Sequence, residues 1–267
     1  MRLAITISIL FIAQFIFGQD FSSDKNILKI EKLNSPKEKA IAYNTVTENA
    51  WQMGALKEGL EYSERGLKIA KENGFKSIES ELHNNRGVTY DYLNQYPNAL
   101  KHYFAALAIQ EKLDDPAMKA KVLGNIGLIY GYQNANEKAI SYHTRALKIS
   151  QSINDESGLS IALNNLAIAQ VQMGKYDEAV ENYLACIEID TKANNIEGLG
   201  DDYNNIALLY MDKKDYKTSL EYLEKSLEIR IAVNNLGTLA ITYGNLGELY
   251  YKLSNFERAE GLFLKAI

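Results

Sequence analysis

The sequence predicts an all-α protein built as a solenoid of antiparallel helix pairs. Three observations lead to this prediction: a pattern that returns every 40 residues, small residues at fixed positions in each period, and only 3 Pro in 267 residues. Proline breaks helix interiors, so its scarcity favours helices. One period cannot bury its apolar face without a neighbour, and the copies are therefore expected to stack.

The first element, residues 1–19, has the features of a secretory signal peptide. Arg2 precedes an apolar run from Leu3 to Phe17, which is followed by small and polar residues. The run has about 15 residues, fewer than the roughly 20 that cross a bilayer as a helix. We expect export to the periplasm or out of the cell, and the alternative is a membrane anchor formed by an uncleaved N-terminus.

Residues 20–35 are expected to cover the N-terminal end of the array, with one short helix over residues 24–33. The next helix should begin at Pro36, because proline is tolerated at the first helical position. Ser35 and Glu38 have the spacing of a capping box, which supports the same start.

A 40-residue period organises residues 36–267. The segment NNRGVTY at 84–90 returns in related form at 124–130, 164–170, 204–210 and 244–250. The copies begin near residues 36, 76, 116, 156, 196 and 236, which makes six repeats with the last one incomplete. Because the chain stops inside the last predicted helix, we expect the native protein to continue beyond Ile267.

Each period divides into two helices, A and B. Asp177 and Glu257 fall in the expected first turn of helix B, where acidic residues suit the positive end of the helix dipole. Pro97 and Pro116 fall where a helix B and a helix A should begin.

Small residues recur where paired helices must approach closely. One such column of helix A holds Gly87, Gly127, Ala167, Ala207 and Gly247. Helix axes come within roughly 8–10 Å only if the contact residues are small. Large residues such as Tyr103 and Phe263 on helix B are expected to fill the space beside them.

The run YxxLGxxY at 243–250, followed by Ala259, Phe263 and Ala266, resembles the tetratricopeptide repeat. Tyr243 stands where that family usually has Trp, and the period of 40 is similar to the variants in kinesin light chains and Rap-type bacterial regulators. The resemblance implies a right-handed solenoid of six tetratricopeptide-like repeats. It also implies that the A helices line a concave groove for a protein or an extended peptide.

Charge argues against a nucleic-acid partner. The chain has 29 basic and 34 acidic residues, a net charge of −5 and a pI near 5.4, whereas binding to a phosphate backbone needs a clustered basic excess. The acidic pairs Asp114-Asp115 and Asp201-Asp202 fall at expected helix starts, where capping accounts for them.

Nothing in the sequence predicts catalysis, a metal or a cofactor. His83, His102 and His143 do not have the spacing of metal ligands, so we expect packing or surface histidines. The single Cys, Cys186, stands where sister repeats have Ala or Ser, and it should pack as a small apolar residue.

An asparagine recurs in the middle of helix A, although Asn is a mediocre helix-interior residue. The column is Asn85, Asn125, Asn165, Asn205 and Asn245. A side-chain amide both donates and accepts, so a column of amides could pair with the backbone of an extended peptide, and the resemblance implies the same role. The alternative is that these residues bond to neighbouring helices and stabilise the stack.

Two further rows share this face of helix A, three and seven residues after each asparagine. The apolar row is Val88, Leu128, Ile168 and Leu208, and the aromatic row begins with Tyr92 and Tyr132. We expect these rows to take the side chains of the peptide. No column of Lys or Arg accompanies them, so recognition of a terminal carboxylate is not expected.

Together these features predict an exported, non-enzymatic scaffold that binds a protein or peptide. By resemblance, such arrays often form the input part of bacterial signalling proteins, such as a histidine kinase or a transcriptional regulator, with a membrane segment further along the chain. The alternative is a free-standing periplasmic or secreted adaptor or assembly protein. An enzyme would need its active site beyond Ile267.

Overall fold

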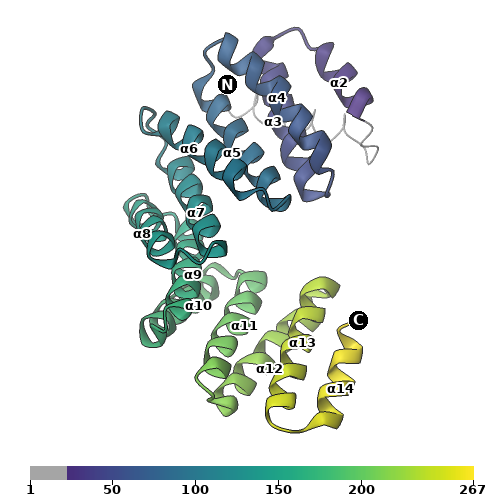
Figure 1. Cartoon of the computed structure of the whole chain (residues 1–267), viewed down its shortest axis with the longest axis vertical. Helices are drawn as coiled ribbons and strands as arrows, with labels where there is room; N and C mark the ends of the chain where they lie inside the picture. The colour runs from purple at the N-terminus through teal and green to yellow at the C-terminus, as the bar shows by residue number, and fades with distance from the viewer. Residues whose placement is uncertain (1–22) are drawn as a thin grey trace. The chain divides into compact units, whose positions relative to one another are not determined.

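The computed structural model describes residues 23–267, which form thirteen α-helices and no strand (Figure 1). The all-α prediction is therefore confirmed for this part of the chain. The predicted signal peptide, residues 1–19, lies outside the described residues. Among the helices that are described, none is long and apolar enough to span a membrane.

The chain forms two compact units that divide after Ile129. The first contains α2 (Ser23–Glu31), α3 (Pro36–Gln52), α4 (Leu56–Glu72), α5 (Lys76–Tyr92), α6 (Tyr96–Gln110) and most of α7 (Pro116–Tyr132). The second contains α8 (Asn136–Ser152), α9 (Glu156–Gln172), α10 (Tyr176–Ala193), α11 (Ile196–Asp212), α12 (Tyr216–Val233), α13 (Leu236–Lys252) and α14 (Phe256–Lys265). The odd-numbered helices from α3 onward are the A helices of the repeats, and the even-numbered helices from α4 onward are the B helices.

Several helix starts lie at the predicted residues. The backbone N–H of Glu38 donates to the Ser35 hydroxyl at 3.5 Å, so Ser35 caps α3. Pro97 is the second residue of α6 and Pro116 is the first of α7. The leading helix α2 covers Ser23–Glu31, a slightly earlier span than the predicted 24–33.

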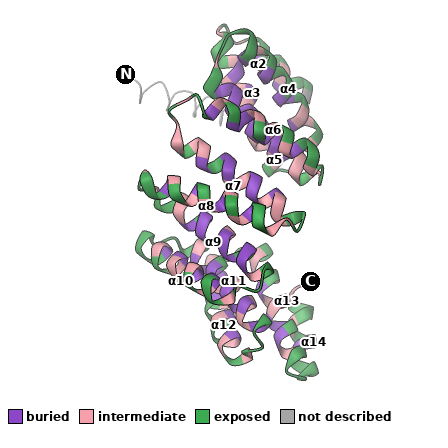
Figure 2. Ribbon diagram, turned by 60° about the vertical axis from the view of Figure 1, so that its left-hand side comes forward, coloured by how far each residue is buried: buried purple, intermediate pink, exposed green. Residues whose placement is uncertain are grey.

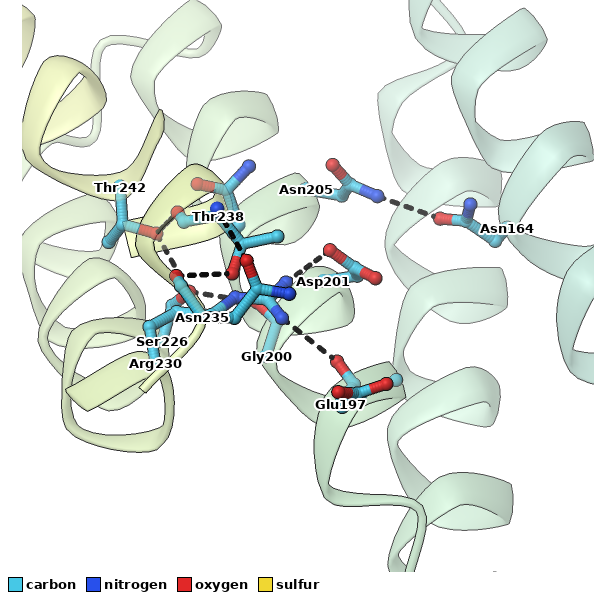
Figure 3. Close-up of polar contacts among 12 residues, drawn as sticks. Asn164, Glu197, Gly200, Asp201, Asn205, Ser226, Arg230, Asn235, Thr238 and Thr242 are labelled. Atoms are coloured by element: carbon cyan, nitrogen blue, oxygen red, sulfur yellow. Dashed lines mark hydrogen bonds and ion pairs between the residues drawn. The ribbon is translucent and has the colours of Figure 1, made fainter. Parts of the chain in front are cut away.

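The capping interpretation holds for one acidic pair and is wrong for the other. Asp115 accepts the backbone N–H of Met118 at 3.0 Å, as a cap should. Asp201 and Asp202 instead lie inside α11, which begins at Ile196 and is capped by Asn195. In the second unit Asp201 forms an ion pair with Arg230 of α12 (Figure 3), and Asp202 is buried.

Most turns between the helices contain one residue in the left-handed conformation. These residues follow one another at intervals of 20, except for one interval of 40 between Asn94 and Asn134: Gly54, Gly74, Asn94, Asn134, Asn154, Gly174, Asn194, Lys214, Asn234 and Ser254. A left-handed residue ends a helix by directing its backbone away from the helical path. The A-to-B turns and the B-to-A turns are therefore built alike, with the connection from α6 to α7 as the exception among the repeats.

Close helix contacts depend on the predicted small residues. A Cβ atom added to Gly87 of α5 would lie 2.5 Å from the Tyr103 ring of α6, and one added to Gly247 of α13 would lie 2.7 Å from the Phe263 ring of α14. Both distances are shorter than van der Waals contact, so neither pair could pack this closely with a larger residue. Buried and exposed residues alternate around each helix (Figure 2).

Candidate functional site

The five asparagines of the predicted column lie in the middle of the A helices α5, α7, α9, α11 and α13. Asn85 is buried, and the other four are half-buried. Each is therefore held among neighbouring helices while most keep contact with solvent.

Four of these amides bond to the preceding A helix and form what we call the asparagine ladder. The Nδ2 of each donates to the Oδ1 of an asparagine 41 residues earlier (Figure 3 shows one rung). The rungs are Asn85 to Asn44 at 3.0 Å, Asn125 to Asn84 at 2.8 Å, Asn205 to Asn164 at 3.0 Å and Asn245 to Asn204 at 2.7 Å. Within each unit, the ladder thus joins neighbouring A helices, as the structural alternative predicted.

The acceptors of the ladder are residues that the sequence analysis did not single out. Asn44, Asn84, Asn164 and Asn204 immediately precede the column, and three of them form Asn-Asn dipeptides with it. A hydrogen bond of this kind contributes roughly 0.5–1.5 kcal/mol to stability. The amide oxygen of Asn85 accepts from Asn84 at 3.4 Å, whereas the half-buried donors Asn125, Asn205 and Asn245 keep an amide oxygen and a second N–H that could bond to a ligand.

Asn165 is the exception in the column. The residue 41 positions before it is Gly124, which has no side-chain oxygen. In the described part of the chain no hydrogen bond is formed by the Asn165 side chain, and none of its polar atoms is fully buried. Its amide can therefore reach solvent with all of its donors and its acceptor unused.

Exposed apolar side chains flank Asn165 on α9. Ile161, one turn before it, is 59% exposed, and Ile168, of the predicted apolar row, is 38% exposed. Residues 161, 165 and 168 share one helix face because they are spaced four and three apart. The sequence analysis missed Ile161 and its counterpart Ile241 on α13, which is equally exposed.

The other predicted residues of this face are placed less uniformly. Val88, Leu128 and Leu208 are half-buried beside their asparagines, so only part of each side chain is open to a ligand. Tyr92 and Tyr132 at the ends of α5 and α7 are exposed. The Tyr92 ring stacks on Trp51 of α3 with ring centroids 5.6 Å apart, which fixes its orientation.

Polar contacts also close one end of the ladder. Asn44 of α3 accepts from Asn85 and donates to the Glu81 carboxylate at 2.9 Å. Both of its partners lie on α5, so two hydrogen bonds join α3 to α5 here. Burial raises the pKa of Glu81 above its ordinary value, since a partly buried carboxylate loses hydration.

Buried ionisable side chains lie in both units, but among the described residues they form no candidate metal centre. No group of three or more His, Cys, Asp or Glu among residues 23–267 could hold a metal ion. Burial lowers the pKa of His143 to about 4 and raises the pKa of the Cys186 thiol to about 12. Cys186 packs in the interior, as predicted, and donates to the Ser160 carbonyl at 3.3 Å.

Comparisons with known proteins agree with this fold. The family model described as "Tetratricopeptide repeat" matches residues 118–192 and 203–267. A search of curated proteins finds no match.

Solved structures resemble the fold over most of the chain. The apo form of RapI has a TM-score of 0.76 at 16% identity, covering 97% of this chain and 95% of that one. A Rap protein complexed with Competence and Sporulation Factor has a TM-score of 0.72 at 20% identity, covering 91% of this chain and 67% of that one. A putative kinesin light chain of Podosopora anserina has a TM-score of 0.61 at 16% identity, covering 76% and 100%. At these identities the likeness shows a shared fold.

Proposed function

Because the chain belongs to the tetratricopeptide repeat family, we propose that it is a non-enzymatic interaction scaffold whose A-helix face binds an extended peptide segment of a partner protein. The observation that carries this proposal is Asn165, a solvent-accessible amide that the asparagine ladder leaves without a partner. A half-buried amide that only solvent reaches can exchange its water contacts for hydrogen bonds to a ligand.

The surroundings of Asn165 suit an extended peptide. Successive side chains of an extended peptide point to opposite sides, so its backbone can bond to an amide while alternate side chains contact apolar residues. Ile161 and Ile168 provide exposed apolar surface on either side of the amide. Both the donor and the acceptor of Asn165 can pair with a peptide group irrespective of the peptide's sequence.

Two observations support a role in signalling and export. One solved structure of the same fold is a Rap protein complexed with Competence and Sporulation Factor, and it covers 91% of this chain. The other is the basic start and short apolar run of the sequence. We further propose that residues 1–19 direct export and that the array serves as the input part of a bacterial signalling protein.

The peptide-binding proposal can be tested with a phage-displayed library of random peptides panned against the full chain. Affinities of the selected peptides are then measured for Asn165→Ala, for Ile161→Asp and for the control Leu184→Ser on α10, which alters an exposed apolar residue of a B helix. We expect Asn165→Ala and Ile161→Asp each to weaken binding about tenfold. A tenfold change in affinity corresponds to about 1.4 kcal/mol, as expected for loss of one uncharged contact.

Circular dichroism of each variant shows whether the fold is intact. Peptides that bind wild type, Asn165→Ala and Ile161→Asp with equal affinity would show that this face is not the binding surface. Equal loss in Leu184→Ser would point to the B helices instead. Export is tested separately, by fusing residues 1–30 to a reporter that is active only outside the cytoplasm; an inactive reporter would contradict it.

A further inference from the structure

A second site is suggested by residues of the second repeat that break the pattern of the array. In the other repeats the position of Arg86 holds Val46, Ile126, Leu166, Ile206 and Leu246. The position of His83 holds Tyr43, Leu123, Leu163, Tyr203 and Tyr243. Apolar or aromatic residues pack at both positions in the other repeats. Arg86 and His83 of the second repeat are therefore not required for packing and need another explanation.

The exposed position of Lys101 shows the same departure. Its counterparts are Glu61, Ser141, Glu181, Glu221 and Gly261, so a basic residue stands where three of the five other copies have an acidic one. All three changed residues face one cavity of about 350 Å³ between α4, α5 and α6 in the first unit. The cavity lies on the B-helix side and is separate from the asparagine ladder.

The cavity is strongly basic although the chain is acidic overall. Lys68 and Lys71 of α4, Arg86 of α5 and Lys101 of α6 line it, and Glu64 is the one carboxylate among its lining residues. Four cationic groups around one carboxylate attract an anion and repel a metal ion.

The Arg86 guanidinium is held in place for an anion. Its Nη1 donates to the Leu60 carbonyl at 2.7 Å and to the Ser63 hydroxyl at 3.0 Å, which fixes the plane of the group. Its Nε is buried without a hydrogen-bond partner. Its Nη2 pairs at 2.9 Å with Glu64, whose side chain is 72% exposed. An exposed carboxylate reaches the guanidinium from the solvent side, so an external anion can take the same place.

Two histidines complete the wall of the cavity. The Nδ1 atoms of His83 and His102 lie 2.9 Å apart, so one ring donates and the other accepts, and Tyr90 stacks on His102 at 5.5 Å. Burial lowers the pKa of His83 to about 4 and of His102 to about 3, with the nearby cations adding to the effect. Both rings are neutral at pH 7, and the accepting ring carries its proton on Nε2, where it is a donor.

We propose that the cavity between α4, α5 and α6 binds a phosphate monoester group, which replaces Glu64 on Arg86 and takes further contacts from Lys71 and Lys101. A dianion matches several cations better than a single carboxylate does, and the Nη2 group of Arg86 can donate a charge-assisted hydrogen bond to a phosphate oxygen. The volume exceeds that of a bare ion and leaves room for the group that carries the phosphate. The phosphate comes from a phosphorylated protein segment or from a small phosphate ester.

The test follows the histidine ring signals of the full chain by NMR during titration with inorganic phosphate and, separately, with a short phosphoserine peptide. The chain has only 3 His, and His143, buried in the other unit, is an internal control. We expect the His83 and His102 signals to move while His143 stays. Tighter binding of the peptide than of phosphate identifies a phosphorylated segment, and equal binding identifies a small phosphate.

Variants that copy the residues of sister repeats keep the fold while removing the charge. Arg86→Leu restores the residue type found at Leu166 and Leu246, and Lys101→Glu restores that of Glu181. Each should weaken phosphate binding about tenfold, as expected for loss of a charge-assisted hydrogen bond. Glu64→Gln should strengthen binding several-fold, because it removes the competing carboxylate.

Lys148→Glu, an exposed lysine of α8, is the matched control that makes the same change in net charge as Lys101→Glu. It should bind like wild type. Unchanged affinity in a folded Arg86→Leu variant, or no strengthening in Glu64→Gln, would overturn the proposal. So would Zn²⁺ shifting the His83 and His102 signals while phosphate leaves them in place, since the site would then be one for a metal ion.

Discussion

Replacing Gly87 by alanine tests whether close helix contact holds a repeat together. The added Cβ would lie 2.5 Å from Cε1 and 2.6 Å from Cδ1 of Tyr103, and that ring is almost fully buried. Overpacking of this kind costs about 1–3 kcal/mol. Alanine gains about 1 kcal/mol over glycine in a helix interior. We therefore expect Gly87→Ala to be destabilising by up to about 2 kcal/mol, against the trend of helix propensity.

Gly124 provides the matched control, since it also lies inside an A helix and its added Cβ would meet nothing within 4 Å. Gly124→Ala should raise the free energy of unfolding by about 1 kcal/mol. Urea unfolding followed by circular dichroism measures both variants. The two midpoints should move in opposite directions. If Gly87→Ala is as stable as Gly124→Ala, the repeat has space that the structure does not show, and the close-contact argument fails.

Three further predictions concern stability. Lys214→Gly should raise the free energy of unfolding by up to about 1 kcal/mol, because Lys214 is left-handed at φ 61° and glycine adopts that region without strain; an unchanged thermal midpoint would contradict this. Asn205→Ala should be about 1 kcal/mol less stable than Asn165→Ala, since both gain helix propensity but only the first loses a rung; equal urea midpoints would refute the ladder's role. Burial, with Asp190 close by, raises the pKa of Asp202 from 3.8 to about 7, so the native state holds a proton that the unfolded state releases between these values. The free energy of unfolding of the wild type should therefore fall by up to about 4 kcal/mol from pH 4 to pH 7. If the difference in free energy of unfolding between wild type and Asp202→Asn does not change with pH, Asp202 is not responsible.

The helix pairs could be predicted from sequence because their determinants are local or repeat in register. Ser35 caps the helix that it precedes, and Pro97 and Pro116 stand at helix starts. The Gly87 position holds Gly or Ala in all five copies of the segment 84–90, so close packing could be inferred without a structure.

The ladder could not be derived from one column read alone. Its rungs join positions 41 residues apart, and this offset depends on how neighbouring A helices are shifted along their axes, which is a tertiary property. The signal that could have found it is the Asn-Asn dipeptide at 84–85, 164–165 and 204–205. Comparison of the donor column with the acceptor column one residue before it would also have shown that Gly124 interrupts the acceptor column.

Buried ionisable groups were missed for a different reason. Asp202 was assigned to a helix start, but Asn195 caps α11 and places Asp202 in its interior, where sister repeats have Leu82, Val122 and Ala162. His83 and His102 are 19 residues apart and meet only because α5 and α6 fold back on each other. A position-by-position comparison of the repeats would have marked both sites as departures from the apolar pattern.

The constant offset between ladder partners restricts how such an array can change length during evolution. Insertion of one residue turns the rest of a helix by about 100°, which would carry the next asparagine away from its acceptor. Gain or loss of 40 residues preserves the offset of 41 between ladder partners and the spacing of the left-handed turns. Genes for arrays of this kind are therefore expected to lengthen by duplicating whole helix pairs, while single-codon insertions within A helices are removed by selection.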